Sequence, residues 1–221
     1  MKLTKAACIA ALLVGSASAA SGPTPLTQWK ASCTQTTSGD ISGLRPGTQT
    51  FEKYYDYPER DRYSFPNGNQ QVYRFDVVDP RTKFGKAFGW NKNSPSNCCF
   101  IWLESLPPGE PPPGQPKKMV PIQVPATGAT DVGPKDGGEH YHQDQNLVVI
   151  DIKQDWVIDP AHNNSILEWN KTVTIGGKYA AIVSTYENVV PHGVSSDDFA
   201  YPSNCTRQCS SNERGTRFTF V

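Results

Sequence analysis

Two histidines stand two residues apart in a polar stretch, and they are the chain's best candidates for binding a metal. His140 and His142 lie within Gly137–Asp144, whose sequence is GGEHYHQD. In an extended segment the side chains at i and i+2 share a face, and a pair of imidazoles can ligate zinc or copper. Two glycines precede the pair and no third or fourth ligand stands nearby at a metal-site spacing. We therefore expect a solvated loop here.

Carboxylates are the second group that could perform chemistry, since two at the right separation can hydrolyse a glycosidic bond as acid and base. The candidates on or beside the predicted strands are Asp56, Glu104, Asp151, Asp155 and Glu168. The distance between two carboxyl groups that decides such a mechanism is three-dimensional, so the sequence cannot pair them. Charges that alternate along a strand are also typical of its solvated face. The sequence also contains no nucleophile elbow, HExxH, phosphate-binding loop or EF-hand loop. It therefore predicts no catalytic residues and a non-enzymatic protein.

Five of the six cysteines follow residue 19, and their spacing favours disulfides over a metal site. They are Cys33, Cys98, Cys99, Cys205 and Cys209, with no Cys-x-x-Cys pair among them. An odd number predicts two bridges and one spare thiol, which is free, capped or joined to a second chain. Because a bridge between neighbouring residues is strained, Cys98 and Cys99 should face opposite sides of a strand and find different partners. We predict that Cys33 and one of this pair bond to Cys205 and Cys209.

Residues 1–19 have the three parts of a cleavable signal peptide. Two lysines form a positive start, Ala6–Val14 is an apolar run, and Ala17–Ala19 fits the small-x-small cleavage rule. The apolar run is far shorter than the roughly 20 residues that cross a bilayer. We expect a mature chain that begins at Ala20 or Ser21, is secreted to the extracellular space, and has no transmembrane span.

Residues 20–221 are expected to form a single domain, because about 200 residues suit one medium-sized core. The full chain has 21 basic and 21 acidic residues, and cleavage removes two lysines to leave a net charge of −2. This balance gives no electrostatic basis for binding nucleic acid. Asn163, Asn170 and Asn204 begin Asn-x-Ser/Thr sequons, which in a eukaryotic secretory pathway become glycosylation sites on exposed turns.

Short β-branched and aromatic runs, separated by proline and glycine, predict an all-β fold of eight or nine antiparallel strands with at most one short helix. The predicted strands are 50–57, 61–65, 71–78, 83–90, 98–103, 119–124, 147–157, 167–175 and 179–186. Residues 20–47 should be irregular, and the proline-rich Pro107–Pro116 should be an exposed loop. We expect two stacked, curved sheets, as a sandwich or an open barrel.

Aromatic rings are the strongest indication of a binding site. Most rings must be core, but a subset between two curved sheets would line a pocket for an apolar ligand. Phe100, Trp102 and Trp156 are the candidate pocket residues, because Cys98–Leu103 is apolar on both faces. The alternative functions are a carbohydrate-binding module or glycosidase that uses exposed rings, and a metal-dependent enzyme centred on the two histidines.

The order of several motifs resembles the ependymin-related proteins, a family of secreted glycoproteins. The resemblance is carried by Cys33, Phe51–Asp56, Arg60 and Arg62, Phe84–Trp90, Cys98 or Cys99, Leu103, Val120-Pro121, Pro125-Ala126, Leu147–Trp156, and Cys205 or Cys209. It implies a lipocalin-like pair of sheets around a deep hydrophobic pocket, lipid-like ligands, calcium association and dimers, and it supplies no catalytic residues. The proline-rich run, the histidine-containing stretch and the odd cysteine count depart from the family's pattern. The resulting hypothesis is a secreted carrier of a hydrophobic or lipid-like ligand, without a cofactor.

Overall fold

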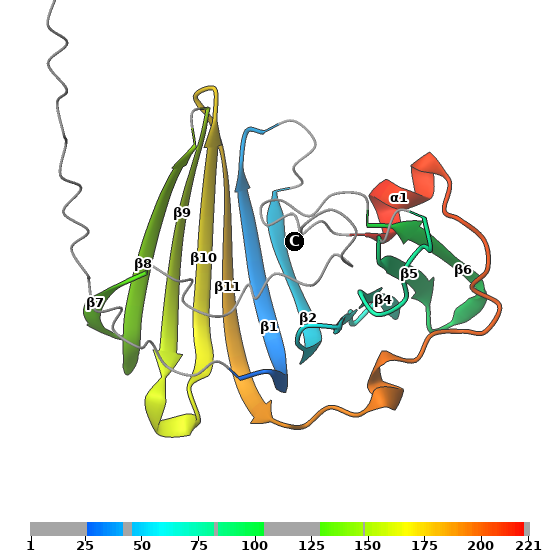
Figure 1. Cartoon of the computed structure of the whole chain (residues 1–221), viewed down its shortest axis with the longest axis horizontal. Coiled ribbons are helices and arrows are strands. Elements are labelled where there is room, and N and C mark those ends of the chain that lie inside the picture. The colour runs from blue at the N-terminus through cyan, green and yellow to red at the C-terminus, as the bar shows by residue number, and fades with distance from the viewer. Residues whose placement is uncertain (1–25, 42–45, 82–83, 104–128, 148, 219–221) are drawn as a thin grey trace, which may run out of the picture.

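The structure is a computed structural model that describes residues 26–41, 46–81, 84–103, 129–147 and 149–218. The described strands form one antiparallel sheet of 11 strands (Figure 1). The strands are β1 Gln28–Gly39, β2 Gly47–Asp56, β3 Arg60–Ser64, β4 Asn69–Arg74, β5 Lys86–Asn91, β6 Ser94–Trp102, β7 Thr130–Lys135, β8 Gly138–Leu147, β9 Ile150–Asp159, β10 Ser165–Ile175 and β11 Lys178–Pro191. Two 3-10 helices, η1 Pro160–His162 and η2 Ser196–Phe199, and one α-helix, α1 Ser211–Arg217, complete the described elements.

The strand order is β6-β5-β4-β3-β2-β1-β11-β10-β9-β8-β7. Two meanders, β1–β6 and β7–β11, therefore meet where β1 pairs with β11. The all-β antiparallel class with one short α-helix is confirmed. The strands are hydrogen-bonded into one continuous sheet, whose twist turns β4–β6 away from the long strands β8–β11 (Figure 1). The expected signal peptide, the Pro107–Pro116 loop and the strand at 119–124 lie outside the described residues.

β1 is the main correction to the predicted strands, because we expected residues 20–47 to be irregular. Trp29, Ala31, Cys33 and Gln35 are buried at every second position of β1. This is the period-two pattern of a strand, but the serines and threonines between these residues give the segment the composition of a loop. β8 is a second correction, since it occupies the stretch around His140 and His142 that we expected to be a loop.

Alternate residues of each strand form two faces, and each face has its own hydrophobic cluster. The inner face includes Trp29, Cys33, Phe51, Tyr55, Tyr63, Phe75, Ile101, Trp156, Trp169 and Tyr186. The outer-face cluster is smaller and includes Val72, Phe88, Trp90, Cys98, Phe199 and Cys205. Strands from both meanders contribute to the inner-face cluster, so the curved sheet has one main core.

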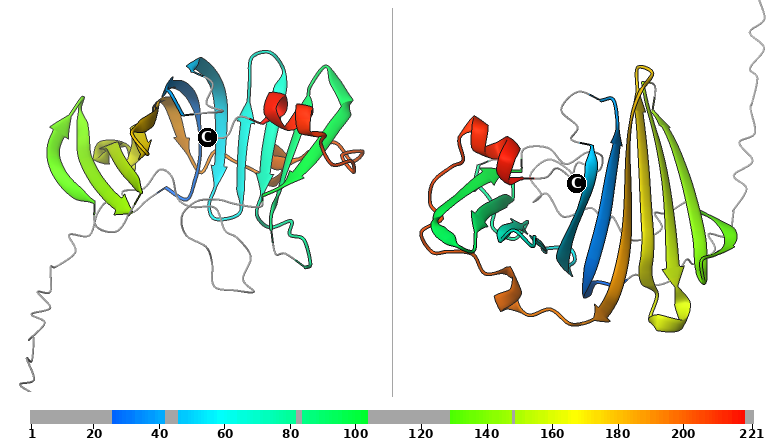
Figure 2. Two further views of the ribbon diagram at one scale, coloured as in Figure 1. Left: turned by 90° about the horizontal axis from the view of Figure 1, so that it is seen from above. Right: turned by 180° about the vertical axis from the view of Figure 1, so that it is seen from behind.

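The chain after β11 crosses the outer face of β3–β6 and covers its cluster. Tyr201 stacks on Phe88 with ring centroids 3.7 Å apart, and Arg60 lies 4.9 Å from the ring centroid of Phe199. Both views of Figure 2 place α1 beside β5 and β6. The C-terminal segment thus supplies the packing that a second sheet layer would supply in a sandwich.

Two disulfides fasten this segment to the two faces of β6. Cys98 bonds to Cys205 and Cys99 bonds to Cys209, with Cα atoms 4.8 and 5.0 Å apart. Cys98 and Cys205 belong to the outer-face cluster, whereas Cys99 and Cys209 belong to the inner-face cluster. Between the bridges, the Phe100 N–H donates to the Arg207 carbonyl at 2.9 Å, and the Cys209 N–H donates to the Phe100 carbonyl at 2.8 Å. The segment therefore wraps around an edge strand and supplies hydrogen-bond partners for part of that strand's backbone.

The prediction that neighbouring cysteines face opposite sides and take different partners is confirmed, as is the single spare thiol. The expected bridge from Cys33 is wrong, because Cys33 is a free, buried thiol. Five strand spacings separate β1 from β6, or about 24 Å, whereas a disulfide needs Cα atoms within about 7 Å. Cys33 therefore cannot reach the cysteines that gather at β6.

Removal of the inner bridge should destabilise the protein much more than removal of the spare thiol. The Cys99–Cys209 bridge closes a loop with a sequence separation of 110 residues, and loss of such a bridge typically costs about 2–5 kcal/mol. We expect this loss for the double variant Cys99→Ala, Cys209→Ala, measured by urea unfolding. Cys33→Ala is the matched control, since it removes a buried thiol and keeps both bridges. An equal loss in the two variants would contradict this account of the segment.

Candidate functional site

The candidate site is a groove that exists because β3 is half as long as the strand it pairs with. β2 has 10 residues and β3 has five. β3 pairs only with Glu52–Asp56, so Gly47–Phe51 has β1 as its sole strand partner among the described residues. The sheet is therefore split at this end.

The sequence Phe65-Pro66-Asn67-Gly68 explains why β3 stops. Pro66 has no N–H to offer a sheet, and Gly68 adopts a φ of +85°, which favours glycine. The turn closes with the Phe65 N–H donating to the Asn69 carbonyl at 2.9 Å. β3 therefore ends at Ser64, the partner of Glu52, and the chain turns back into β4 instead of continuing along β2.

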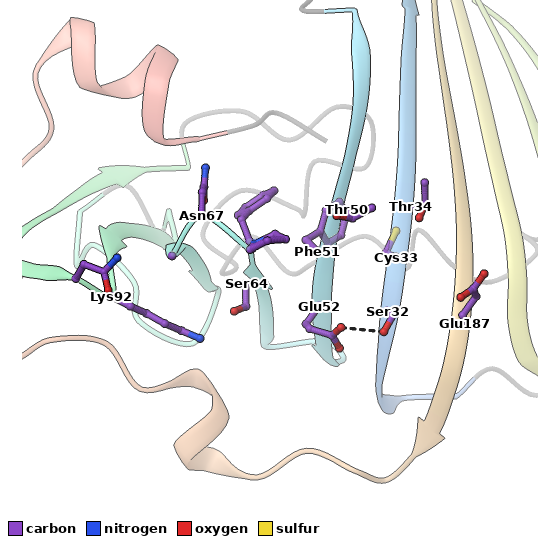
Figure 3. A pocket seen from close by; sticks show the side chains of 14 residues that line it. Ser32, Cys33, Thr34, Thr50, Phe51, Glu52, Ser64, Asn67, Lys92 and Glu187 are labelled. Carbon is purple, nitrogen blue, oxygen red and sulfur yellow. Dashed lines mark hydrogen bonds between the residues drawn. The ribbon is translucent and has the colours of Figure 1, made fainter.

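The groove has a volume of about 790 Å³ and two walls (Figure 3). One wall comes from β1, β2 and β11, and the other from the turn after β3 and the turn between β5 and β6. The two turns are tied together, because the Lys92 N–H donates to the Gly68 carbonyl at 2.8 Å and Asn91 Nδ2 donates to the Asn67 carbonyl at 3.1 Å. This wall is therefore held by one backbone hydrogen bond and one hydrogen bond from the Asn91 side chain.

Three apolar lining residues continue the inner-face core. Cys33 and Phe51 are buried cross-strand partners on β1 and β2. The Phe51 ring lies 5.2 Å from the Tyr63 ring and 5.4 Å from the Phe65 ring, measured between centroids. We call Cys33, Phe51 and Phe65 the floor of the groove.

The upper lining is polar and carries charges on both walls. Ser32 pairs with Glu187 on one side and with Glu52 on the other, so the three side chains form one row on the outer face. Ser32 Oγ donates to Glu52 Oε1 at 2.8 Å. Lys92 lies on the opposite wall (Figure 3). We call Glu52, Glu187 and Lys92 the charged rim.

A buried polar triad packs behind the floor. Lys53 Nζ donates to the Tyr63 hydroxyl at 2.8 Å, that hydroxyl donates to Asp61 Oδ2 at 2.8 Å, and Lys53 and Asp61 form an ion pair at 3.3 Å. Burial raises the pKa of Asp61, although Lys53 opposes the shift. The Tyr55 hydroxyl and Asp61 Oδ1 are buried and have no hydrogen-bond partner among the described residues, and the two residues are cross-strand neighbours. The triad positions Phe51 through Tyr63.

The floor thiol of Cys33 is poorly suited to nucleophilic chemistry. Burial raises its pKa from 9.0 to about 11, and the nearby Lys53 only partly opposes this shift. A thiol with such a pKa is neutral at physiological pH, and the thiolate is the reactive form. Cys33 therefore acts as a small apolar side chain in the groove.

The three predicted pocket residues do not come together. Trp156 lies on the inner face, whereas Phe100 packs against the outer-face cluster. Trp102 lies 5.5 Å from Phe100, edge to face, with Lys86 4.5 Å from its ring centroid. Phe100 and Trp102 share one face of β6, and the sheet separates them from Trp156, so the three residues do not line a single pocket.

His140 and His142 come together around one carboxylate from the next strand. His140 Nε2 and His142 Nδ1 each lie 2.9 Å from Asp155 Oδ1. His142 Nε2 also lies 3.1 Å from Asp144 Oδ2, and the hydrogen bonds to Asp155 and Asp144 raise the pKa of His142. No group of three or more potential ligands in the described part of the chain is arranged to hold a metal ion.

The remaining predicted site residues occupy ordinary structural positions. Asp56 accepts from Arg60 Nε at 2.7 Å, and Glu168 forms an ion pair with Lys135 at 2.5 Å. Asp151 is an exposed residue of β9, and Glu104 lies outside the described residues. Three of the four described carboxylates, Asp56, Asp155 and Glu168, are thus held in ion pairs with basic side chains.

The sequons fall in two kinds of environment. Asn163 and Asn204 are exposed and lie outside the strands, as expected for glycosylation sites. Asn170 is half-buried on β10, where its Nδ2 donates to Glu168 Oε1 at 2.7 Å. Occupancy of all three stays a prediction.

Sequence reasoning missed the charged rim. The sequence Pro-Asn-Gly could have predicted the turn that forms one wall of the groove. Glu52, Glu187 and Lys92 carry no motif, because they meet only through the pairing of β11, β1 and β2 and the position of a distant turn.

Comparison with known proteins gives structural likenesses only. No protein-family model and no curated protein matches the chain. A DUF1329 family protein from Desulfovibrio piger is similar over 83% of this chain and 92% of its own, with 10% identity and a TM-score of 0.39. A LolA superfamily protein from Nitrosomonas europaea covers 80% of this chain and 92% of its own, with 10% identity and a TM-score of 0.22. At these scores no functional conclusion follows from either protein.

Tyr63, a member of the triad, and Tyr55, a neighbour of Asp61, should change the free energy of unfolding in opposite directions when each is replaced by Phe. Tyr63→Phe deprives Lys53 and Asp61 of a shared partner and should lower the free energy of unfolding by about 1–3 kcal/mol. Tyr55→Phe removes an unpartnered buried hydroxyl and should raise the free energy of unfolding by about 1 kcal/mol. Urea unfolding measures both, and equal effects of the same sign would contradict the triad.

The raised pKa of Cys33 predicts a loss of stability at alkaline pH. Between pH 9 and 11 the unfolded chain releases the thiol proton while the folded chain keeps it. Stability then falls as pH rises through this window, by at most about 1.4 kcal/mol per pH unit from this group. The difference in unfolding free energy between the wild type and Cys33→Ala should therefore shrink from about pH 8 to about pH 10. A constant difference would show that the thiol has an ordinary pKa.

Proposed function

We propose that this chain is a secreted, non-enzymatic binding protein that holds a hydrophobic, lipid-like ligand in the groove beside β2. The observation that carries the proposal is the combination of an apolar floor, a polar rim and a volume of about 790 Å³. Binding sites for small molecules typically measure roughly 300–1,000 Å³. This groove falls in that range, and its lining combines the apolar Cys33, Phe51, Phe65 and Pro66 with a larger set of polar residues. A ligand with an apolar body and a polar end matches both parts of this groove.

The floor supports binding more strongly than chemistry. Its one reactive atom type, the thiol of Cys33, has a pKa raised to about 11 by burial. The floor rings of Phe51 and Phe65 belong to a packed aromatic set that the triad holds in place. Side chains that are already held in place favour binding, because little side-chain entropy is lost when a ligand arrives.

The carbohydrate alternative has less support. A sugar platform needs exposed rings, but Trp29, Trp90, Trp156 and Trp169 are buried. Trp102 is half-buried and its ring is covered by Lys86. The five tryptophans are therefore committed to packing, and Tyr179 on β11 is the exposed aromatic ring among the described residues.

Secretion is supported by the two disulfides, because such bonds persist in oxidising compartments. No described helix is long and apolar enough to cross a membrane. The resemblance to the ependymin-related family adds calcium association and dimerisation to the proposal, and these two properties rest on that resemblance alone.

Mass spectrometry of organic extracts tests the proposal when the protein is purified from a secreting host. We expect a co-purifying lipid-like molecule in the wild type. Thr50→Trp should reduce its amount at least about tenfold, because Thr50 is exposed on the groove wall and an indole there fills the opening.

Thr48→Trp is the matched control, since Thr48 is an exposed residue of the same strand and lies outside the groove. It should carry as much lipid as the wild type. An empty wild-type protein, or a Thr50→Trp variant as loaded as the wild type, would contradict the proposal.

A further inference from the structure

Two side chains of the charged rim, Glu187 and Lys92, have no ion-pair partner among the residues that the structure describes. Lys92 extends from the turn wall and Glu187 lies on β11 in the strand wall (Figure 3), and neither side chain has a hydrogen bond or ion pair with another residue in the described part of the chain. Glu52 uses one oxygen for Ser32 and leaves the other available. Two carboxylates on one wall therefore face one ammonium on the other.

This distribution selects among polar head groups. A cationic group on the strand wall would lie between Glu52 and Glu187, which flank Ser32 in adjacent strands. An anionic group on the turn wall would meet Lys92. A purely anionic head would meet two like charges for each opposite one, and such juxtaposition suppresses binding of the wrong partner.

We propose that the groove selects amphiphiles with a zwitterionic head group, in which an ammonium lies at Glu52 and Glu187 and a phosphate lies at Lys92. The inference rests on the proposed function, because the apolar tail must occupy the floor at Phe51 and Phe65. The charged rim then binds the head group, and the floor binds the tail.

Isothermal titration of the delipidated full-length protein at low ionic strength tests this selection. Lysophosphatidylcholine should bind about tenfold more tightly than lysophosphatidylglycerol of the same tail, which keeps the phosphate and lacks the ammonium. Phosphocholine without a tail should bind much more weakly than either lipid.

Two conservative variants locate the effect. Glu187→Gln should reduce the preference for the zwitterionic lipid roughly two- to fivefold, since a solvent-exposed ion pair contributes only modestly. Lys92→Gln should weaken binding of both lipids by a similar factor, because both carry the phosphate. Glu59→Gln and Lys178→Gln, exposed and outside the groove, are the matched controls and should change nothing.

The outcomes separate the two proposals. Equal affinity for both lipids, or a preference unchanged by Glu187→Gln, would overturn the head-group inference and leave lipid binding standing. No binding of any tailed ligand would overturn the proposed function itself. Phosphocholine that binds as tightly as the lipid would show that a free metabolite is the ligand, which also overturns lipid carriage.

Discussion

The early end of β3 is the constraint on which the candidate site depends. β1 and β2 pair along ten residues of β2, but the proline and glycine after Ser64 turn the chain back after five residues of β3. The split leaves the side of β2 open at Thr50 and Phe51. If β3 continued, its own residues would fill the space that forms the groove, and the floor would be ordinary core.

The two faces of the sheet explain why an opening at this position is both apolar and polar. Cys33 and Phe51 point to the inner face, where the aromatic cluster and the Lys53–Asp61–Tyr63 triad pack behind them. Ser32, Glu52 and Glu187 occupy the intervening positions and point to the outer face. Because the groove lies at an exposed strand edge, it reaches residues of both faces. An amphiphile is the class of ligand that uses both.

Some of this arrangement was predictable from local sequence. The all-β class followed from the short aromatic and β-branched runs, and the opposite directions of Cys98 and Cys99 followed from disulfide geometry. β1 was missed because its buried side chains are spaced among serines and threonines. The groove was missed for a different reason. Glu187 meets Glu52 only because the last strand returns beside the first, and pairing between distant segments leaves no local pattern in the sequence.

The position of a bound tail shows whether the groove binds an amphiphile. A crystal structure of the protein with a lysophosphatidylcholine brominated along its acyl chain would reveal the bromine by anomalous scattering. We expect bromine beside Phe51 and Phe65, with the head group near Glu187 and Lys92. Bromine bound elsewhere on the molecule, with the groove filled by solvent alone, would contradict this expectation.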